Sequence, residues 1–209
     1  MSKIVVAIFG EGKGHATRGK VIIDYLISQK HDLLIVTSKN AYKYLKDDYR
    51  EVIEVMGFGF DFGEQKINII KTLQKNINTS ILNGHKTLIK LTKLFLKINP
   101  DLIITDFEPF SPLVGKIKNI PFLSITNMHI IPFYKIDYLR SWFKDYLYTT
   151  AVINNMYIFS KHYFITSFYF PQVKKFYKKK TTLIKPIIRK EIVDLKPKKG
   201  NKILAYLTK

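Results

Sequence analysis

A histidine and an arginine directly follow a glycine-rich turn near the start of the chain. Residues 10–18, Gly-Glu-Gly-Lys-Gly-His-Ala-Thr-Arg, come after the apolar run Ile4–Phe9, which predicts a buried strand. Glycine permits positive φ and close approach of a ligand, and a helix that starts here directs free N–H groups at an anion. Because the imidazole of His15 can exchange protons near neutral pH, these residue types indicate an anionic ligand beside a proton acceptor.

The glycine spacing fits neither of the two common nucleotide motifs. A dinucleotide fingerprint needs a third glycine where His15 stands, and an acid about 20 residues later, but the second predicted strand is followed by residues 37–39, Thr-Ser-Lys. A phosphate-binding P-loop needs Gly-Lys-Ser/Thr, whereas Lys13 is followed by Gly14. On spacing alone, a plain strand-to-helix turn with a surface histidine remains the alternative.

Two further polar clusters follow apolar strands. Asp106 and Glu108 come after the run at 102–105, and Asn127 and His129 come after the run at 122–125. Ligands of open α/β sheets bind at the carboxyl ends of the strands, so we expect these side chains to share one pocket with the glycine loop. The alternative for the two acids is that they cap the helix that follows.

Strands and helices alternate along the chain. The periodicity predicts strands at 4–9, 33–36, 52–56, 102–105, 122–125, 163–166 and 182–184. It predicts helices at about 16–29, 40–45, 67–98 with a break near 83–84, 110–118 and 137–159, and a glycine- and aromatic-rich loop at 57–63. This pattern is typical of a doubly wound parallel α/β sheet with the strand order 3-2-1-4-5.

Composition narrows the class of protein. The chain has 209 residues and a formal net charge of +19. It contains no cysteine, which excludes a disulfide framework, a thiolate metal site and a cysteine nucleophile. Few of the basic residues are arginine, so the charge favours an anionic membrane surface over specific nucleic-acid readout. No apolar run reaches the roughly 18 residues that span a bilayer. We expect a cytoplasmic protein that is peripheral to the membrane, with the aromatic and basic segment 131–144 as the contact.

At residues 10–18, 100–109 (Pro-Asp-Leu-Ile-Ile-Thr-Asp-Phe-Glu-Pro) and 120–129, the sequence resembles the N-terminal half of a GT-B glycosyltransferase. It is most similar to a prokaryotic family of nucleotide-sugar transferases related to the lipid I N-acetylglucosaminyltransferase. The resemblance covers about residues 3–209. It implies two facing Rossmann-like domains, the first holding the acceptor and the second a nucleotide-sugar, expected to be a UDP-sugar, with a glycan or lipid-linked acceptor and no cofactor or catalytic metal.

The resemblance also implies roles for individual residues. A histidine after the glycine loop serves as the base in some relatives, so His15 is the candidate base, with Asp106 and Glu108 as further candidate catalytic residues. The candidate substrate-binding residues are Gly12, Lys13, Gly14, Arg18, Asn127 and His129.

The resemblance further implies that the donor-binding half is absent or only begun. We expect an acceptor-binding domain at 1–195, then at 196–209 a polar linker and the first strand, 203–207, of the nucleotide-sugar-binding domain. A missing C-terminal domain or a partner subunit would complete the enzyme, and the chain alone is expected to be inactive. Two other readings stay open: a non-catalytic nucleotide-binding module, and a basic protein that binds membranes or nucleic acid.

Overall fold

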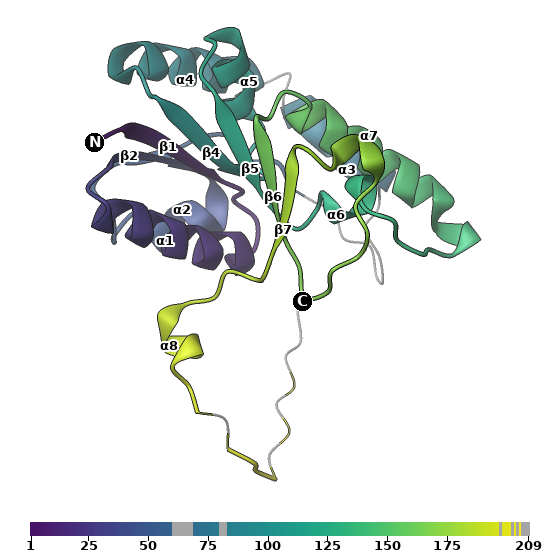
Figure 1. Cartoon of the computed structure of the whole chain (residues 1–209). Helices are drawn as coiled ribbons and strands as arrows, with labels where there is room; N and C mark the ends of the chain where they lie inside the picture. The colour runs from purple at the N-terminus through teal and green to yellow at the C-terminus, as the bar shows by residue number, and fades with distance from the viewer. Residues whose placement is uncertain (60–68, 80–82, 197, 202, 204, 206–209) are drawn as a thin grey trace.

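Seven parallel strands form one sheet at the centre of the molecule (Figure 1). The computed structural model describes residues 1–59, 69–79, 83–196, 198–201, 203 and 205. The strands are β1 (Lys3–Ile8), β2 (Asp32–Thr37), β3 (Val52–Glu54), β4 (Leu102–Asp106), β5 (Phe122–Ile125), β6 (His162–Thr166) and β7 (Thr181–Ile184). Their order, β3-β2-β1-β4-β5-β6-β7, confirms the predicted order and extends it by two strands at one edge.

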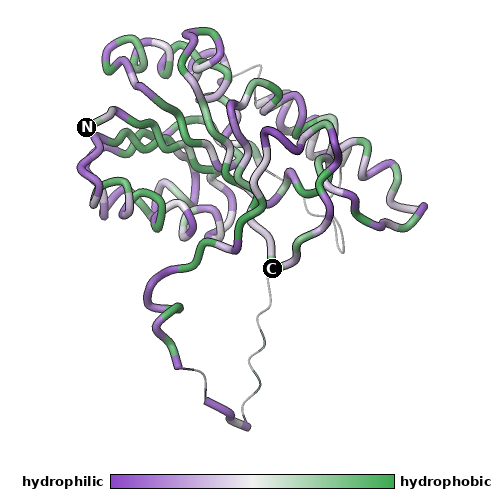
Figure 2. Tube along the Cα trace, in the orientation of Figure 1, coloured by the Kyte–Doolittle hydropathy of each residue, from purple (hydrophilic) through white to green (hydrophobic). Residues whose placement is uncertain are grey.

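Helices cover both faces of the sheet. They are α1 (Lys13–Ser28), α2 (Lys39–Leu45), α3 (Ile69–Thr79), α4 (His85–Ile98), α5 (Phe110–Ile117), α6 (Ile130–Phe133), α7 (Phe143–Tyr157) and α8 (Lys190–Val193), with short 3-10 turns η2 (Arg140–Trp142) and η3 (Lys175–Tyr177). The alternation along β1 divides the core: Ile4 and Val6 pack with α1 and α2, whereas Val5 and Ala7 pack with α4, α5 and α7. The strands accordingly form the most continuously apolar part of the chain in Figure 2.

Several element boundaries differ from the sequence-based expectation. Helix α1 begins at Lys13 rather than near residue 16. Helix α7 begins at Phe143 rather than near residue 137, because residues 135–139 have no regular structure and residues 140–142 form the 3-10 turn η2. The long helical region divides into α3 and α4. Helices α6 and α8 are too short for a periodic signal and were not predicted.

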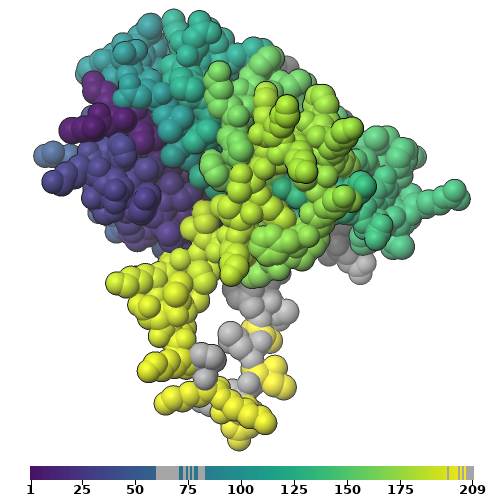
Figure 3. Space-filling model, viewed as in Figure 1, coloured from purple at the N-terminus to yellow at the C-terminus, as the bar shows by residue number. Residues whose placement is uncertain are grey.

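After β7 the chain leaves the sheet and projects from the body (Figures 1 and 3). In the predicted strand 203–207, Ile203 and Ala205 are exposed and have no regular structure, and the other residues lie outside the described part of the chain. Residues 60–63 of the predicted loop 57–63 also lie outside it. The boundary placed between residues 195 and 196 stays a prediction.

Candidate functional site

The glycine loop places His15 and Arg18 on the first turns of α1. Gly12 has φ 75°, a left-handed conformation that favours glycine, and α1 begins at the next residue. Any side chain at Gly10 would collide with Ser38, so the loop packs directly on the β2–α2 connection. Lys13 and Gly14 are exposed at the helix start. Because His15 and Arg18 are three residues apart, they lie on one face of α1.

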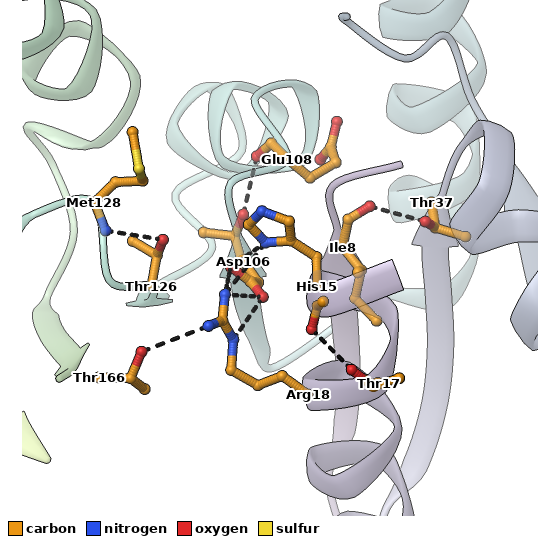
Figure 4. Close-up of polar contacts among 12 residues, drawn as sticks. Ile8, His15, Thr17, Arg18, Thr37, Asp106, Glu108, Thr126, Met128 and Thr166 are labelled. Carbon is orange, nitrogen blue, oxygen red and sulfur yellow. Dashed lines mark hydrogen bonds and ion pairs between the residues drawn. The ribbon is translucent and has the colours of Figure 1, made fainter. Parts of the chain in front are cut away.

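Asp106 at the carboxyl end of β4 joins these two side chains (Figure 4). Asp106 pairs in register with Ile8 of β1, so it lies beside the start of the glycine loop. Its Oδ1 is 2.9 Å from His15 Nδ1, and Arg18 donates from Nε to Oδ2 at 2.9 Å and from Nη2 to both oxygens at 2.7 Å. The Asp106 residue is 3% exposed. A buried carboxylate therefore fixes both the imidazole and the guanidinium.

The hydrogen-bond pattern sets the tautomer of His15. A 2.9 Å contact between Nδ1 and a carboxylate oxygen needs a proton between them, so Nδ1 donates to Asp106. Arg18 Nη2, which is 3.2 Å from Nδ1, has donors only and is satisfied by Asp106. In the neutral ring Nε2 then carries the lone pair, and no described residue hydrogen-bonds to it. Since the His15 side chain is 23% exposed, this nitrogen is suited to accept a proton.

An open pocket of about 290 Å³ lies beside Arg18. Its polar lining comes from α1 and from the ends of β5 and β6: Gly14, Thr17, Arg18, Asn127, Thr166 and Ser167. Its apolar lining comes from Ile130, Phe168, Tyr169, Pro186 and Ile187. Arg18 Nη1 is 3.5 Å from Thr166 Oγ1, which links the pocket to the contacts of Asp106. Three residues predicted for the site, Gly14, Arg18 and Asn127, thus line one pocket, whereas Asp106 is not among its lining residues and reaches it only through Arg18.

Glu108 does not join this pocket. Its carboxylate accepts the backbone N–H groups of Phe110 at 2.9 Å and Ser111 at 2.8 Å, which caps the first turn of α5. Burial raises the pKa of this carboxyl, and the hydrogen bonds from Ser111 and Phe110 oppose the shift. Glu108 therefore caps a helix, which was the alternative that the sequence left open for the two acids. The expectation that Glu108 shares the pocket is wrong.

His129 lies in the core rather than in the pocket. It is 0% exposed and packs against the rings of Phe133, Tyr157 and Tyr163, with centroids 4.9–5.1 Å away. Neither ring nitrogen has a hydrogen-bond partner among the described residues. Burial lowers the pKa of His129 to about 3, so it is neutral near pH 7. The expectation that His129 shares the pocket is therefore wrong, because α6 turns it into an aromatic cluster.

The sequence analysis missed four pocket residues in or just after β6: Thr166, Ser167, Phe168 and Tyr169. The rule that selected Asp106 and Asn127, namely polar residues at the carboxyl end of a parallel strand, applies equally to Thr166 and Ser167. No helix in the described ranges is long and apolar enough to cross a membrane. The same residues contain no group of three or more His, Cys, Asp or Glu side chains that could hold a metal ion.

Known structures share this fold. MurG from Acinetobacter baumannii has a TM-score of 0.54 and 12% identity over 88% of this chain and 45% of MurG. The calicheamicin glycosyltransferase CalG4 has a TM-score of 0.51 and 14% identity over 78% of this chain and 47% of CalG4. MnaA from S. aureus, solved with UDP, has a TM-score of 0.50 and 12% identity over 79% of this chain and 39% of MnaA.

These likenesses confirm a Rossmann-like half of a GT-B fold, and the chain spans less than half the length of each of the three structures. No curated protein matches the sequence. A family model described as Glycosyl transferase family 1 matches residues 2–209, nearly the whole chain. The chain therefore belongs to glycosyl transferase family 1.

Proposed function

We propose that this chain is the acceptor-binding half of a glycosyltransferase that uses a nucleotide-sugar, with His15 as the base that activates the acceptor. The observation that carries the proposal is the contact between His15 Nδ1 and Asp106 Oδ1 at 2.9 Å, which leaves Nε2 without a partner among the described residues. The family match and the UDP in the MnaA structure support a nucleotide-sugar, and we propose a UDP-sugar as the donor.

The chemistry follows from the orientation of the ring. An acceptor hydroxyl hydrogen-bonds to Nε2 of His15 and gives up its proton as its oxygen attacks the anomeric carbon. The bond from that carbon to the nucleoside diphosphate breaks, and the diphosphate leaves with the electron pair. Asp106 accepts from Nδ1–H throughout and stabilises the imidazolium that forms, as the acid of a serine protease triad does. Arg18 holds the Asp106 carboxylate in place from its other side.

The pocket beside Arg18 suits an acceptor with one polar and one apolar side. Hydroxyl and amide groups of Thr17, Asn127 and Thr166 can bind sugar or phosphate oxygens, and Phe168 and Tyr169 can pack on an aglycone or on the apolar face of a sugar ring. Both a glycan and a lipid-linked acceptor have this character. The exposed start of α1, at Lys13 and Gly14, offers N–H groups to a phosphate of the donor or acceptor.

We propose that a second domain or a partner subunit supplies the donor-binding half. The three related structures are each more than twice as long as the part that this chain covers. Half of a cleft lacks the proximity that brings donor and acceptor together. We therefore expect the 209-residue chain alone not to transfer sugar, and we expect activity when the second half is supplied.

The test is turnover by the chain joined to its donor-binding half. UDP release is measured from UDP-glucose and UDP-N-acetylglucosamine with a panel of phenol, glycan and lipid-linked acceptors. His15→Ala should lower kcat by about 100-fold or more, because a general base contributes at least that much. His85→Ala is the control, since His85 is exposed on α4. Near wild-type turnover by His15→Ala would remove His15 from the mechanism.

A further inference from the structure

Two phenylalanine rings lie against the imidazole of His15. The rings of Phe9 and His15 meet edge to face, with centroids 5.3 Å apart and planes at 76°. Phe107 lies nearly parallel to His15, with centroids 6.3 Å apart and planes at 22°. The two phenylalanine rings also meet each other edge to face at 5.3 Å. These separations are those of favourable aromatic pairs, so the three rings form one cluster.

The cluster is buried on its phenylalanine side and open on its histidine side. Phe9 and Phe107 are 5% and 8% exposed, and both belong to the hydrophobic core on the face of the sheet that α4, α5 and α7 cover. Phe107 also lies beside Tyr157 of α7, with ring centroids 6.3 Å apart. Because core side chains are closely packed, the two phenylalanine rings form a fixed wall behind the partly exposed imidazole.

Phe107 reaches His15 through an unusual backbone conformation. Asp106 and Phe107 are consecutive, and consecutive side chains of a regular strand point to opposite faces. Here both lie against the same imidazole, Asp106 at Nδ1 (Figure 4) and Phe107 beside the ring. The φ of 61° at Phe107 ends the alternation of the strand at this point. A bulky residue persists in this region only where its surroundings impose it, and such residues cluster at active sites.

Hydrogen bonds hold the chain on both sides of Phe107. Before it, the Phe9 N–H donates to the Asp106 carbonyl at 2.9 Å. After it, the Thr105 hydroxyl donates to the Glu108 carbonyl at 2.9 Å, and the Glu108 carboxylate caps α5. None of these bonds uses the Phe107 side chain. A substitution of Phe107 should therefore remove the ring and leave the turn in place.

The hydrogen bond to Asp106 does not orient the imidazole by itself. The ring can turn about the contact between Nδ1 and the carboxylate, and it can flip so that Nε2 faces the carboxylate instead. Either movement takes the Nε2 lone pair away from an acceptor hydroxyl. Two rings that meet the imidazole at different angles, one nearly parallel and one edge to face, restrict both movements.

We propose that Phe107 is a positioning residue that holds His15 in the orientation and tautomer that direct Nε2 outward. The proposal rests on the function proposed above, in which His15 is the base. It also gives the left-handed turn a purpose, since adjacent residues then supply the carboxylate and the wall of one site. Phe107 does not line the pocket beside Arg18. Its loss should therefore lower kcat and leave KM nearly unchanged.

The first test is the tautomer of His15 in the purified chain. Long-range proton–nitrogen correlation NMR distinguishes a protonated ring nitrogen from a bare one, and His15→Ala assigns the signal among the five histidines. Wild type should show a neutral ring protonated only at Nδ1. Phe107→Leu keeps the apolar bulk without the flat ring, and Phe107→Gly adopts the left-handed turn without strain. Both should show a mixture of the two neutral tautomers. The proposal is overturned if the folded variants keep the single wild-type tautomer.

The second test is turnover by the chain joined to its donor-binding half. Phe107→Leu should lower kcat by about 10- to 100-fold, because a misplacement of about 1 Å costs up to that much. Phe95→Leu is the matched control, since Phe95 is a core phenylalanine, 1% exposed, near the end of α4 and before the amino end of β4. It should keep the tautomer of His15 and kcat. Equal effects of Phe95→Leu would overturn the proposal, because loosening of the core would then explain them.

The two readouts separate this proposal from the proposed function. If His15→Ala retained turnover while Phe107→Leu mixed the tautomers, His15 would not be the base, and the orienting role of Phe107 would stand. If His15→Ala lost turnover while Phe107→Leu kept both the tautomer and kcat, His15 would remain the base, and the positioning role of Phe107 would be wrong.

Discussion

Asp106 and Glu108 are two residues apart, yet their carboxylates lie on opposite faces of the sheet. Asp106 faces α1, where it binds Arg18 and His15. Glu108 faces α5, where it accepts the backbone N–H groups of Phe110 and Ser111. Both residues are 3% exposed, so burial does not distinguish them. The difference is that a cation neutralises Asp106 and none neutralises Glu108 among the described contacts.

The backbone between the two acids explains the divergence. In a regular strand, residues i and i+2 point to the same face. Phe107 has φ 61°, a left-handed conformation that is a genuine outlier for a bulky residue. It ends the strand and directs Glu108 to the other face.

The two histidines also differ in their surroundings. His15 contacts a carboxylate, whereas His129 lies among aromatic rings in the core. Residue type alone therefore does not identify a reactive group in this fold.

The largest expected effect comes from removing the shared carboxylate. Asp106→Ala leaves the Arg18 guanidinium, whose side chain is 15% exposed, without its buried partner. We expect a loss of about 3–5 kcal/mol in the free energy of unfolding. Denaturant unfolding measures it, with Asp48→Ala as the control, because the exposed pair Lys20–Asp48 should contribute about 1 kcal/mol or less. If both variants lost the same free energy of unfolding, the contacts of Asp106 would be no stronger than those of an ordinary surface ion pair.

A smaller effect should follow from the buried histidine as the pH falls. The folded-state pKa of His129 is about 3, below the ordinary 6.5, so in this range the unfolded chain takes up a proton that the folded chain does not. Stability is therefore present above pH 6.5 and is lost as the pH falls toward 3. Between pH 6.5 and pH 4 this loss is roughly 3 kcal/mol.

The variant His129→Phe should lack this part of the pH dependence and keep its fold, because its ring fits an aromatic cluster. Chemical unfolding of both proteins from pH 7 to pH 4 gives the difference. Parallel curves for wild type and variant would contradict this, because they would mean that His129 takes up its proton as readily in the folded chain as in the unfolded chain. In the full enzyme, turnover by His129→Phe at pH 7 should stay close to that of wild type, in contrast to His15→Ala.

The smallest effect should come from the acid that caps α5. Glu108→Gln replaces one accepting oxygen by an NH₂ group, which should cost about 1 kcal/mol as a weakened helix cap does. Because the pKa of Glu108 is raised, the folded chain holds a proton that the unfolded chain has released. The stability of wild type relative to the variant should therefore fall as the pH rises from 4.5 to the raised value, and stay constant above it.

Unfolding of both proteins at closely spaced pH values between 4 and 8 checks the sign of this trend. Glu51→Gln is the control, since Glu51 is exposed and its variant should run parallel to wild type. A trend of the opposite sign would show that the two backbone N–H groups outweigh the burial of the charge.

The strand order and the edge that carries the site could be predicted from the sequence, because apolar runs and the parallel topology determine both. The meeting of His15 with Asp106 follows from that order. The burial of His129 could not be predicted from its position after a strand. The apolar residues around it, from Met128 to Phe133, were nevertheless a signal for the core. The left-handed turn at Phe107 and the exposure of Phe176 depend on tertiary packing, so local patterns do not reveal them.

The separation of His15 and Asp106 by 91 residues has a consequence for how the protein folds. Their contact exists only after β1 has paired with β4, and pairing of such distant segments is slow compared with the closing of β1 onto β2. A slip of one residue in that register would turn Asp106 to the other face. A chain in which α1 has formed but β1 has not paired with β4 would therefore have an unoriented imidazole, so the contact of His15 with Asp106 reports on that long-range pairing rather than on the local helix.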